Sequence, residues 1–198
     1  MTNSEAVKMK LTCKAQGELM ARHKKLDRNA LLDAAEILVR ERGSHALSLA
    51  NVAETANVSK GGIQSNFGTR ENLINALLER WEGTLQNAVV TISEQAAPSV
   101  SELDIQIQAS RLAYNQNPDH YKAMMILITQ SDELRSRSRD WFRDSLSKVE
   151  KNKLTSRNDK LKLLLNEAMI AIHALDLTSL SEQEWKYLLE DLDAKMEN

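Results

Sequence analysis

The sequence contains few of the residues that bend or crosslink a chain. Its 198 residues include two prolines, six glycines and one cysteine, Cys13, and aromatic residues make up 4%. A single cysteine excludes an intramolecular disulfide, and no Cys/His cluster has zinc-finger spacing. Because Leu, Ala, Glu, Lys and Arg are abundant while proline and glycine are scarce, the composition predicts an all-α fold.

Long apolar runs and recognisable catalytic motifs are absent as well. No run approaches the roughly 20 apolar residues that span a bilayer, and Lys8, Lys10 and Lys14 interrupt any signal-peptide core. We therefore expect a cytoplasmic protein with no membrane partner. The sequence lacks a Gly-rich phosphate loop, a metal-ligand cluster and a nucleophile–base set, so we expect neither an enzyme nor a cofactor.

Charge is unevenly distributed along the chain. Residues 1–80 contain 12 Lys and Arg against 9 Asp and Glu, a net +3, and residues 81–198 contain 14 against 19, a net −5. A few basic contacts from each of two subunits would suffice to bind DNA phosphates. The polarity therefore favours a DNA-binding N-terminal part and a solvating C-terminal part.

The stretch from Ser48 to Arg70 organises the N-terminal part. It predicts two short helices joined at Asn57, a residue that tolerates the left-handed conformation. Gly68 ends the second helix. The hydroxyl residues are expected to cap the successive helices and could also donate to phosphate, and they are Ser48, Ser59 and Thr69. A compact helix-turn-helix of this kind is built to enter a DNA groove.

The exposed face of the second short helix contains the predicted base-reading residues. Val52, Ile63 and Phe67 are expected in the core, which leaves Lys60, Gln64 and Asn66 outside. The alternative is an ordinary solvated helix face. Gly62 would allow close backbone approach to DNA, or is simply tolerated there.

The segment before this motif is predicted to be an arm followed by a helix. Residues 1–21 lack periodicity and are expected to be flexible, and residues 22–28 contain a basic cluster. That cluster either forms a solvated helix entry or contacts DNA phosphates and the minor groove. A helix from about Asp27 should end at Gly43.

The C-terminal part predicts further helices, of which one has two apolar stripes. The helix from Arg157 to about Asp176 has one stripe that includes Leu161, Leu165, Ala168, Ile172 and Leu175 and a second stripe, every seventh residue, of Leu163, Ile170 and Leu177. We expect this helix and the last one, with Trp185 and Leu189, to form a homodimer interface. Alternatively, both stripes are buried inside one monomer.

Aromatic and methionine residues of the C-terminal part suit an adaptable apolar pocket for a small molecule. The alternative for each is an ordinary core position. The candidates for ligand binding are Trp81, Tyr114, His120, Met124, Met125, Trp141 and Phe142.

The N-terminal motif resembles the tetracycline-repressor (TetR) family of bacterial one-component regulators. The resemblance covers about Lys25 to Leu85, in the segments ALLDAAEILVRERG, LSLANVAETANVSKGGIQSNF and GTRENLINAL. It implies a three-helix DNA-binding head on an all-helical ligand-binding and dimerisation domain, with about nine helices in total. It also implies a homodimeric repressor that a small-molecule effector releases from a near-palindromic operator.

The chain departs from the family pattern at three positions. Asn57 replaces the usual glycine, Gln64 replaces an aromatic residue that is most often a DNA-contacting tyrosine, and Arg70 replaces the usual lysine. Gln64 can instead hydrogen-bond an adenine edge. By the resemblance, Arg70 should bind a phosphate.

The sequence therefore predicts a DNA-binding transcriptional regulator with three parts. These are an arm (1–21), a DNA-binding domain (22–85, with its helix-turn-helix at 48–67) and a ligand-binding and dimerisation domain (86–198). A helical protein-interaction module is the alternative function, and a small all-helical enzyme is a further one.

Overall fold

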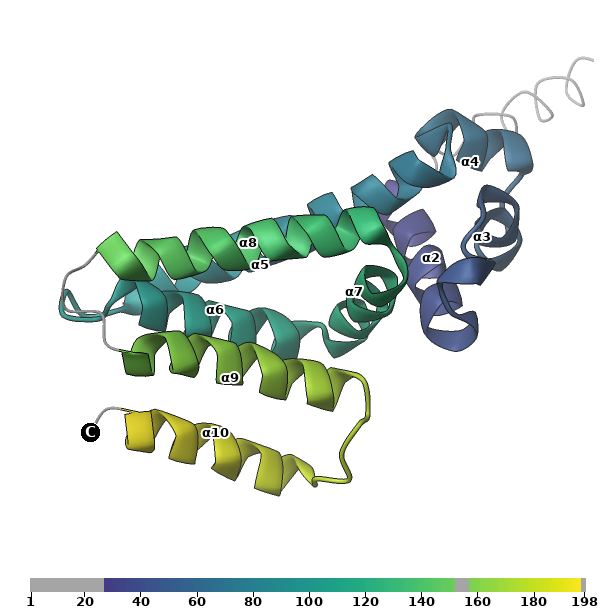
Figure 1. Ribbon diagram of the computed structural model, residues 1–198. Helices are drawn as coiled ribbons and strands as arrows, with labels where there is room; N and C mark the ends of the chain where they lie inside the picture. The colour runs from purple at the N-terminus through teal and green to yellow at the C-terminus, as the bar shows by residue number, and fades with distance from the viewer. Residues whose placement is uncertain (1–26, 152–156, 197–198) are drawn as a thin grey trace, which may run out of the picture.

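The computed structural model describes residues 27–151 and 157–196. All regular structure in these two ranges is helical (Figure 1), which confirms the predicted all-α class. The predicted arm at residues 1–21 lies outside the described residues. Within the described ranges, the nine α-helices and one 3₁₀ turn are α2 (Arg28–Arg42), η1 (Ser44–Ala46), α3 (Leu49–Thr55), α4 (Lys60–Phe67), α5 (Arg70–Gln95), α6 (Glu102–Gln116), α7 (Pro118–Gln130), α8 (Asp132–Lys151), α9 (Arg157–Ala174) and α10 (Glu182–Met196).

Helix α2 begins and ends where the sequence predicts. The Asp27 side chain accepts a hydrogen bond from the Asn29 amide at 2.9 Å, which caps the N-terminus. Gly43 ends the helix with φ +79°, a backbone conformation that suits glycine, and its N–H donates to the Val39 carbonyl. The boundaries follow from local rules of helix capping.

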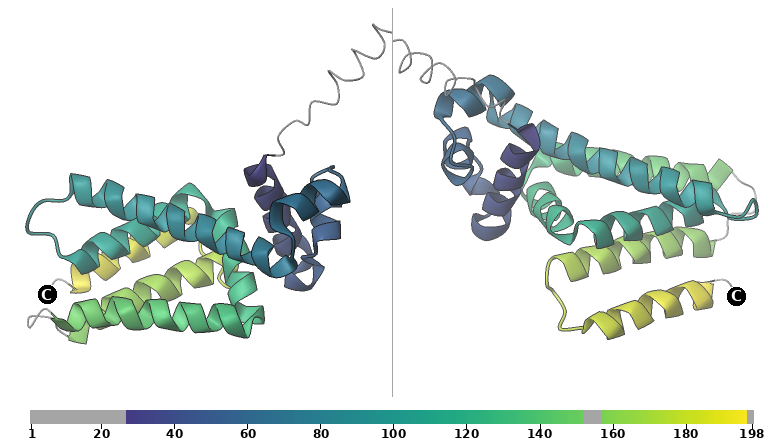
Figure 2. Two further views of the ribbon diagram at one scale, coloured as in Figure 1. Left: turned by 90° about the horizontal axis from the view of Figure 1, so that it is seen from above. Right: turned by 180° about the vertical axis from the view of Figure 1, so that it is seen from behind.

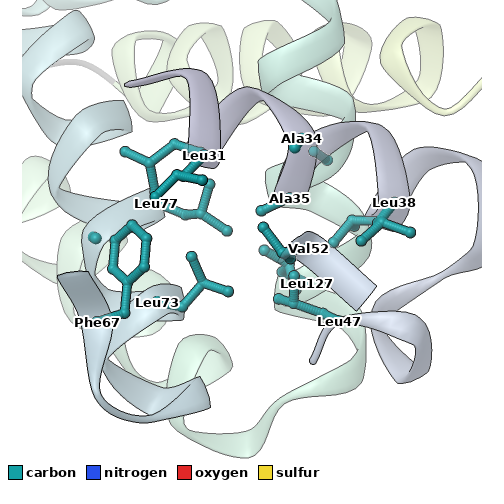
Figure 3. Close-up of a cluster of buried hydrophobic side chains, with 14 of the residues drawn as sticks. Leu31, Ala34, Ala35, Leu38, Leu47, Val52, Phe67, Leu73, Leu77 and Leu127 are labelled. Atoms are coloured by element: carbon teal, nitrogen blue, oxygen red, sulfur yellow. The ribbon is translucent and has the colours of Figure 1, made fainter. Parts of the chain in front are cut away.

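Helices α2, α3 and α4 and the first turns of α5 form a head around one apolar core. Figure 3 shows its side chains converging from all four helices, with Leu31 of α2, Val52 of α3, Phe67 of α4 and Leu77 of α5 facing one another. Each of these side chains is at most 3% exposed. Since Val52, Ile63 and Phe67 are all buried, the predicted inward face of the motif is confirmed.

The core of the head does not stop at the motif. Ala123, Met124 and Leu127 of α7 and Leu134 of α8 belong to the same buried cluster. Met124 is 2% exposed in this core and does not stand beside a pocket as predicted. The predicted domain boundary at residue 85 falls within the continuous helix α5, so head and body share both a helix and a core.

The body consists of α5 to α10, most of them long helices running in similar directions (Figure 2). Helices α5 and α6 pack through Ala88, Ala109 and Ala113. Helix α10 packs against α9, where Trp185 joins a cluster with Tyr114 and Ile170. None of the described helices is long and apolar enough to cross a bilayer.

Ion pairs join the head to the body. Glu36 of α2 accepts hydrogen bonds from the Arg80 guanidinium of α5 and from His120 Nδ1 of α7. Arg40 of α2 pairs with Asp119 at the start of α7. His120 was predicted as a pocket residue, but it is 2% exposed at this junction and its partner comes from the head.

Candidate DNA-binding surface and ligand cavity

Three hydroxyl side chains set the starts of the helices in the head. Ser48 caps α3 through the Asn51 amide, Ser59 caps α4 through the Gly62 amide, and Thr69 caps α5 through the Asn72 amide, each at 3.1 Å. The predicted caps are confirmed. Each oxygen is the acceptor in its cap, so the hydroxyl proton remains available for a phosphate.

Two residues with positive φ orient α4. Asn57 has φ +52°, which confirms the left-handed turn predicted between α3 and α4. Gly68 has φ +71° and its N–H donates to the Gln64 carbonyl at 2.9 Å, which closes the C-terminus of α4. Both turns are therefore fixed by the local chain.

The exposed face of α4 presents amide side chains that are held on their own helix. Lys60 and Gln64 are exposed, and Asn66 is half-buried. Gln64 Nε2 donates to the Gly68 carbonyl at 2.6 Å, and Asn66 Nδ2 donates to the Gly62 carbonyl at 2.9 Å. A bidentate contact from Gln64 to adenine therefore requires its amide nitrogen to leave Gly68.

The two glycines at the start of α4 leave its surface open. A Cβ atom at Gly61 would meet no atom within 4 Å, so packing inside the chain does not require a glycine there. Gly62 is half-buried, and its N–H is used in the Ser59 cap. Close approach of another backbone to α4 is consistent with both positions.

Arg70 makes a contact that the sequence did not predict. Its Nε donates to the Leu47 carbonyl at 2.7 Å, and its Nη2 donates to the Ser44 carbonyl at 3.1 Å. The guanidinium thus braces the loop before α3 against the start of α5. The predicted phosphate role must be compatible with this brace, because two of the donors are already used.

Arg28 is a candidate for DNA contact at the end of the basic cluster for which phosphate contact was one predicted role. Its guanidinium lies 4.9 Å from the centre of the Phe67 ring, and its Nη1 donates to the Asn66 carbonyl at 3.4 Å. The side chain is therefore held at the C-terminal end of α4. Its place in the basic cluster at residues 22–28 was the available signal.

A cavity of about 670 Å³ lies in the body, and a volume of this size is ordinary for a small-molecule site. Of the predicted pocket residues, Trp81, Met125, Trp141 and Phe142 line it, whereas Tyr114, His120 and Met124 do not. Five helices supply the lining, which comprises Leu78, Trp81, Glu82, Leu85, Gln86, Val89, Gln106, Tyr121, Met125, Ile128, Leu134, Arg137, Ser138, Trp141, Phe142, Asp144, Ser145, Leu164, Glu167, Ala168 and Ala171.

Glu167 is a buried acid in this lining that sequence reasoning missed. Burial raises the pKa of its carboxyl above the ordinary value of 4.5, although hydrogen bonds with Ser110, Asn166 and Tyr121 act in the opposite direction. The available signal was its position, because Glu167 interrupts the apolar face of α9 between Leu163 and Ile170, both fully buried.

The two stripes of α9 have different environments. Leu163 and Ile170 of the second stripe are buried inside the chain, although its third member, Leu177, is 68% exposed. Leu161, Leu165 and Ile172 of the first stripe are 39–44% exposed. Ala168 is exposed at the edge of the cavity, and Leu175 is half-buried. The alternative that both stripes are buried in one monomer is therefore wrong.

The predicted interface residues of α10 face inward. Trp185 is 6% exposed, and its ring stacks on His173 of α9 with centroids 4.4 Å apart. Leu189 is half-buried against the same cluster. Trp185 thus holds α10 on α9, and Tyr187 and Leu188 are the large apolar side chains that are exposed in the described part of α10.

Residues 31–77, from α2 into α5, match the family described as bacterial regulatory proteins, tetR family. A curated relative is the HTH-type transcriptional regulator BetI of Rhizobium meliloti (strain 1021), 28% identical over 111 residues. By the family match, residues 31–77 form an N-terminal region of the TetR type. The match to BetI covers 54% of this chain and 55% of BetI, so the chain spans about half the length of this relative.

Solved structures of regulators share the fold of this chain. A fatty acid metabolism regulator assigned in Clostridium perfringens has a TM-score of 0.62 at 16% identity, covering 82% of this chain and 96% of that one. A TetR-like regulator from Rhodococcus sp. RHA1 has a TM-score of 0.59 at 21% identity, covering 83% of this chain and 91% of that one. The multidrug binding protein EbrR, complexed with imidazole, has a TM-score of 0.55 at 17% identity, covering 83% of this chain and 88% of that one.

Sequence identities this low show only that the all-helical architecture is shared. The ligands named for those proteins are therefore not assigned to this chain. Proteins of the TetR family are transcriptional regulators that bind DNA and are not enzymes, in agreement with the interpretation of the sequence.

Proposed function

We propose that this chain is a homodimeric repressor that a small molecule releases from a near-palindromic operator. Residues 22–85 would bind DNA, and residues 86–198 would bind the ligand and form the dimer. The DNA-contacting residues would be Ser48, Ser59, Lys60, Gly62, Gln64, Asn66, Thr69 and Arg70, with Arg28 added.

The observation that carries the proposal is the double role of α7. Its Met124 and Leu127 are buried in the core of the head, while its Tyr121, Met125 and Ile128 line the cavity. Helix α5 likewise runs from the head, at Leu77, to the cavity, at Trp81. A ligand that displaces either helix therefore acts on the head directly, provided that it binds the two arrangements with different affinity.

The exposed stripe of α9 supports the homodimer. Leu161, Leu165 and Ile172 form an apolar strip too regular for scattered surface leucines, and Leu188 of α10 is also exposed. A second copy of the chain would cover these side chains in a symmetric four-helix contact. The two α4 helices would then face successive major grooves.

Gln64→Ala tests the assignment of α4 to base reading. We expect it to relax base preference at one operator position, with a loss of about 1–3 kcal/mol for the preferred base, because alanine cannot bond an adenine edge. Binding is measured against a library of operator variants derived from the DNA upstream of the gene, at several salt concentrations, and sedimentation gives the number of subunits.

Gln95→Ala is the matched control, since Gln95 is exposed at the far end of α5. It should leave both affinity and base preference unchanged. If Gln64→Ala retains the full sequence preference, the base-reading assignment is wrong. A chain that sediments as a monomer and binds no DNA in a salt-dependent manner would overturn the repressor proposal as a whole.

A further inference from the structure

The cavity in the body is lined by aromatic rings from three helices. Trp81 of α5 and Tyr121 of α7 lie edge to face with centroids 6.4 Å apart, and Trp141 and Phe142 of α8 do so at 4.9 Å. An aromatic ring carries negative potential on its face and attracts a cation there. The walls therefore suit an apolar body that carries positive charge.

Acidic side chains outnumber basic ones in the same lining. Glu82, Asp144 and Glu167 line the cavity, and Arg137 is the single cation among the lining residues that the structure describes. Arg137 Nη2 already bonds Glu82 Oε1 at 2.6 Å. An anionic ligand would meet an excess of carboxyl groups here, whereas a cationic ligand would balance it.

Of the three carboxyl groups in the lining, Glu167 is the least exposed, at 9%. It accepts a hydrogen bond from Asn166 Nδ2 at 3.2 Å, and Ser110 and Tyr121 also bond to it. These three donors are neutral, while the Arg111 guanidinium, which bonds Asn166 Oδ1 at 2.6 Å, also acts on Glu167 through its positive charge. Because burial raises the pKa of Glu167, a positive charge entering the cavity would favour its ionised form.

We propose that the cavity binds a bulky lipophilic organic cation, held against the rings of Trp81 and Trp141 and neutralised by Glu167. A volume of about 670 Å³ accommodates several fused rings. This inference rests on the proposed function in that the cavity is the effector site. The class of ligand follows from the chemistry of the lining.

Three probes of nearly the same shape and different charge test the proposal. These are 10-methylacridinium, a permanent cation, acridine, which is neutral slightly above neutral pH, and acridine-9-carboxylate, an anion. Affinities for the full chain are measured by calorimetry without DNA. We expect the cation to bind about tenfold tighter than the neutral ring, and the anion to bind most weakly.

Two variants locate the source of the preference. Glu167→Gln keeps the size of the side chain and removes its charge, so the affinity for 10-methylacridinium should fall about tenfold while that for acridine changes less than about twofold. Trp141→Leu keeps an apolar wall but removes the aromatic face. It should therefore lower the affinity for the cation more than the affinity for neutral acridine. Glu79→Gln, an exposed carboxylate of α5 outside the lining, should change neither affinity.

Equal affinity for the cation and the neutral ring, tightest binding of the carboxylate, or no binding of any probe to the wild-type chain would each overturn the proposal. If Glu167→Gln lowered the affinities for 10-methylacridinium and acridine equally, Glu167 would have only a packing role and its assignment would be overturned. Operator binding is measured separately with and without 10-methylacridinium. If the cation binds with the expected preference but leaves DNA affinity unchanged, the ligand class stands and the effector role fails.

Discussion

The side chains of the head fill its interior more completely than those of the body. In the head, short helices with side-chain caps close around leucine, valine and phenylalanine side chains that are almost completely buried. In the body, helices of up to 26 residues enclose a cavity of about 670 Å³ and leave leucines of α9 exposed. Because protein interiors are normally filled, the places left unfilled or uncovered in the body are those where a ligand and a second copy are expected to fit.

The largest expected difference between the two regions lies in their tolerance of a lost phenyl ring. Phe67→Ala in the head should destabilise the chain by about 3–5 kcal/mol, because the ring is 3% exposed among fixed neighbours. Phe142→Ala at the cavity should cost roughly 1 kcal/mol, since that ring is half-buried beside space that is already empty. Urea unfolding of both variants measures the difference. Equal losses would mean that the body is packed as tightly as the head.

The next effect concerns the ion pairs that connect the two regions. Burial alone would raise the pKa of Glu36, but His120 and Arg80 outweigh it and hold that pKa below its ordinary value of 4.5. The ionised form therefore contributes stability above the unfolded pKa, and this is lost as pH falls through the folded pKa. Glu36→Gln should cost about 2 kcal/mol near neutral pH, and the deficit should shrink in acid below pH 4.5.

Urea unfolding at neutral and acidic pH checks this prediction. Glu41→Gln is the matched control, because Glu41 is an exposed carboxylate of the same helix. It should change the free energy of unfolding by less than about 0.5 kcal/mol at either pH. A Glu36→Gln deficit that stays constant with pH would show that shape, and not charge, joins the head to the body.

The smallest of the three effects compares helix caps. Ser59→Ala in the head should cost about 1 kcal/mol because the Gly62 amide loses its hydrogen bond to the Ser59 side chain. Asn117→Ala should cost much less, since Asn117 precedes α7 without making a side-chain cap. Thermal unfolding of both variants gives the comparison. A similar loss in the two variants would mean that the Ser59 side chain contributes little to the stability of α4.

The sequence predicted most of the head because its determinants are local. The caps at Ser48, Ser59 and Thr69 and the left-handed Asn57 depend on neighbours within a few residues. The brace from Arg70 could not be predicted in this way. Its partners, Leu47 and Ser44, are 23 and 26 residues away and become neighbours only when the head is folded.

In the body, the sequence predicted the helices but only part of the cavity. Met124 and Met125 are adjacent, yet the first is buried in the core of the head and the second lines the cavity. A helix turns by about 100° per residue, so which of two neighbours faces the cavity depends on how α7 is rotated against α2. Tertiary packing sets that rotation, and composition carries no signal for it.

The contact between α5 and α6 has a consequence for how the body can deform. Its buried centre consists of Ala88, Ala109 and Ala113, and alanine has no side-chain rotamers to interlock. Two helices that meet on such a smooth surface can slide along their axes with little repacking. Leu85 and Val89, which pack against this alanine contact, also line the cavity, so an occupant that pushes on them acts directly on the contact between α5 and α6.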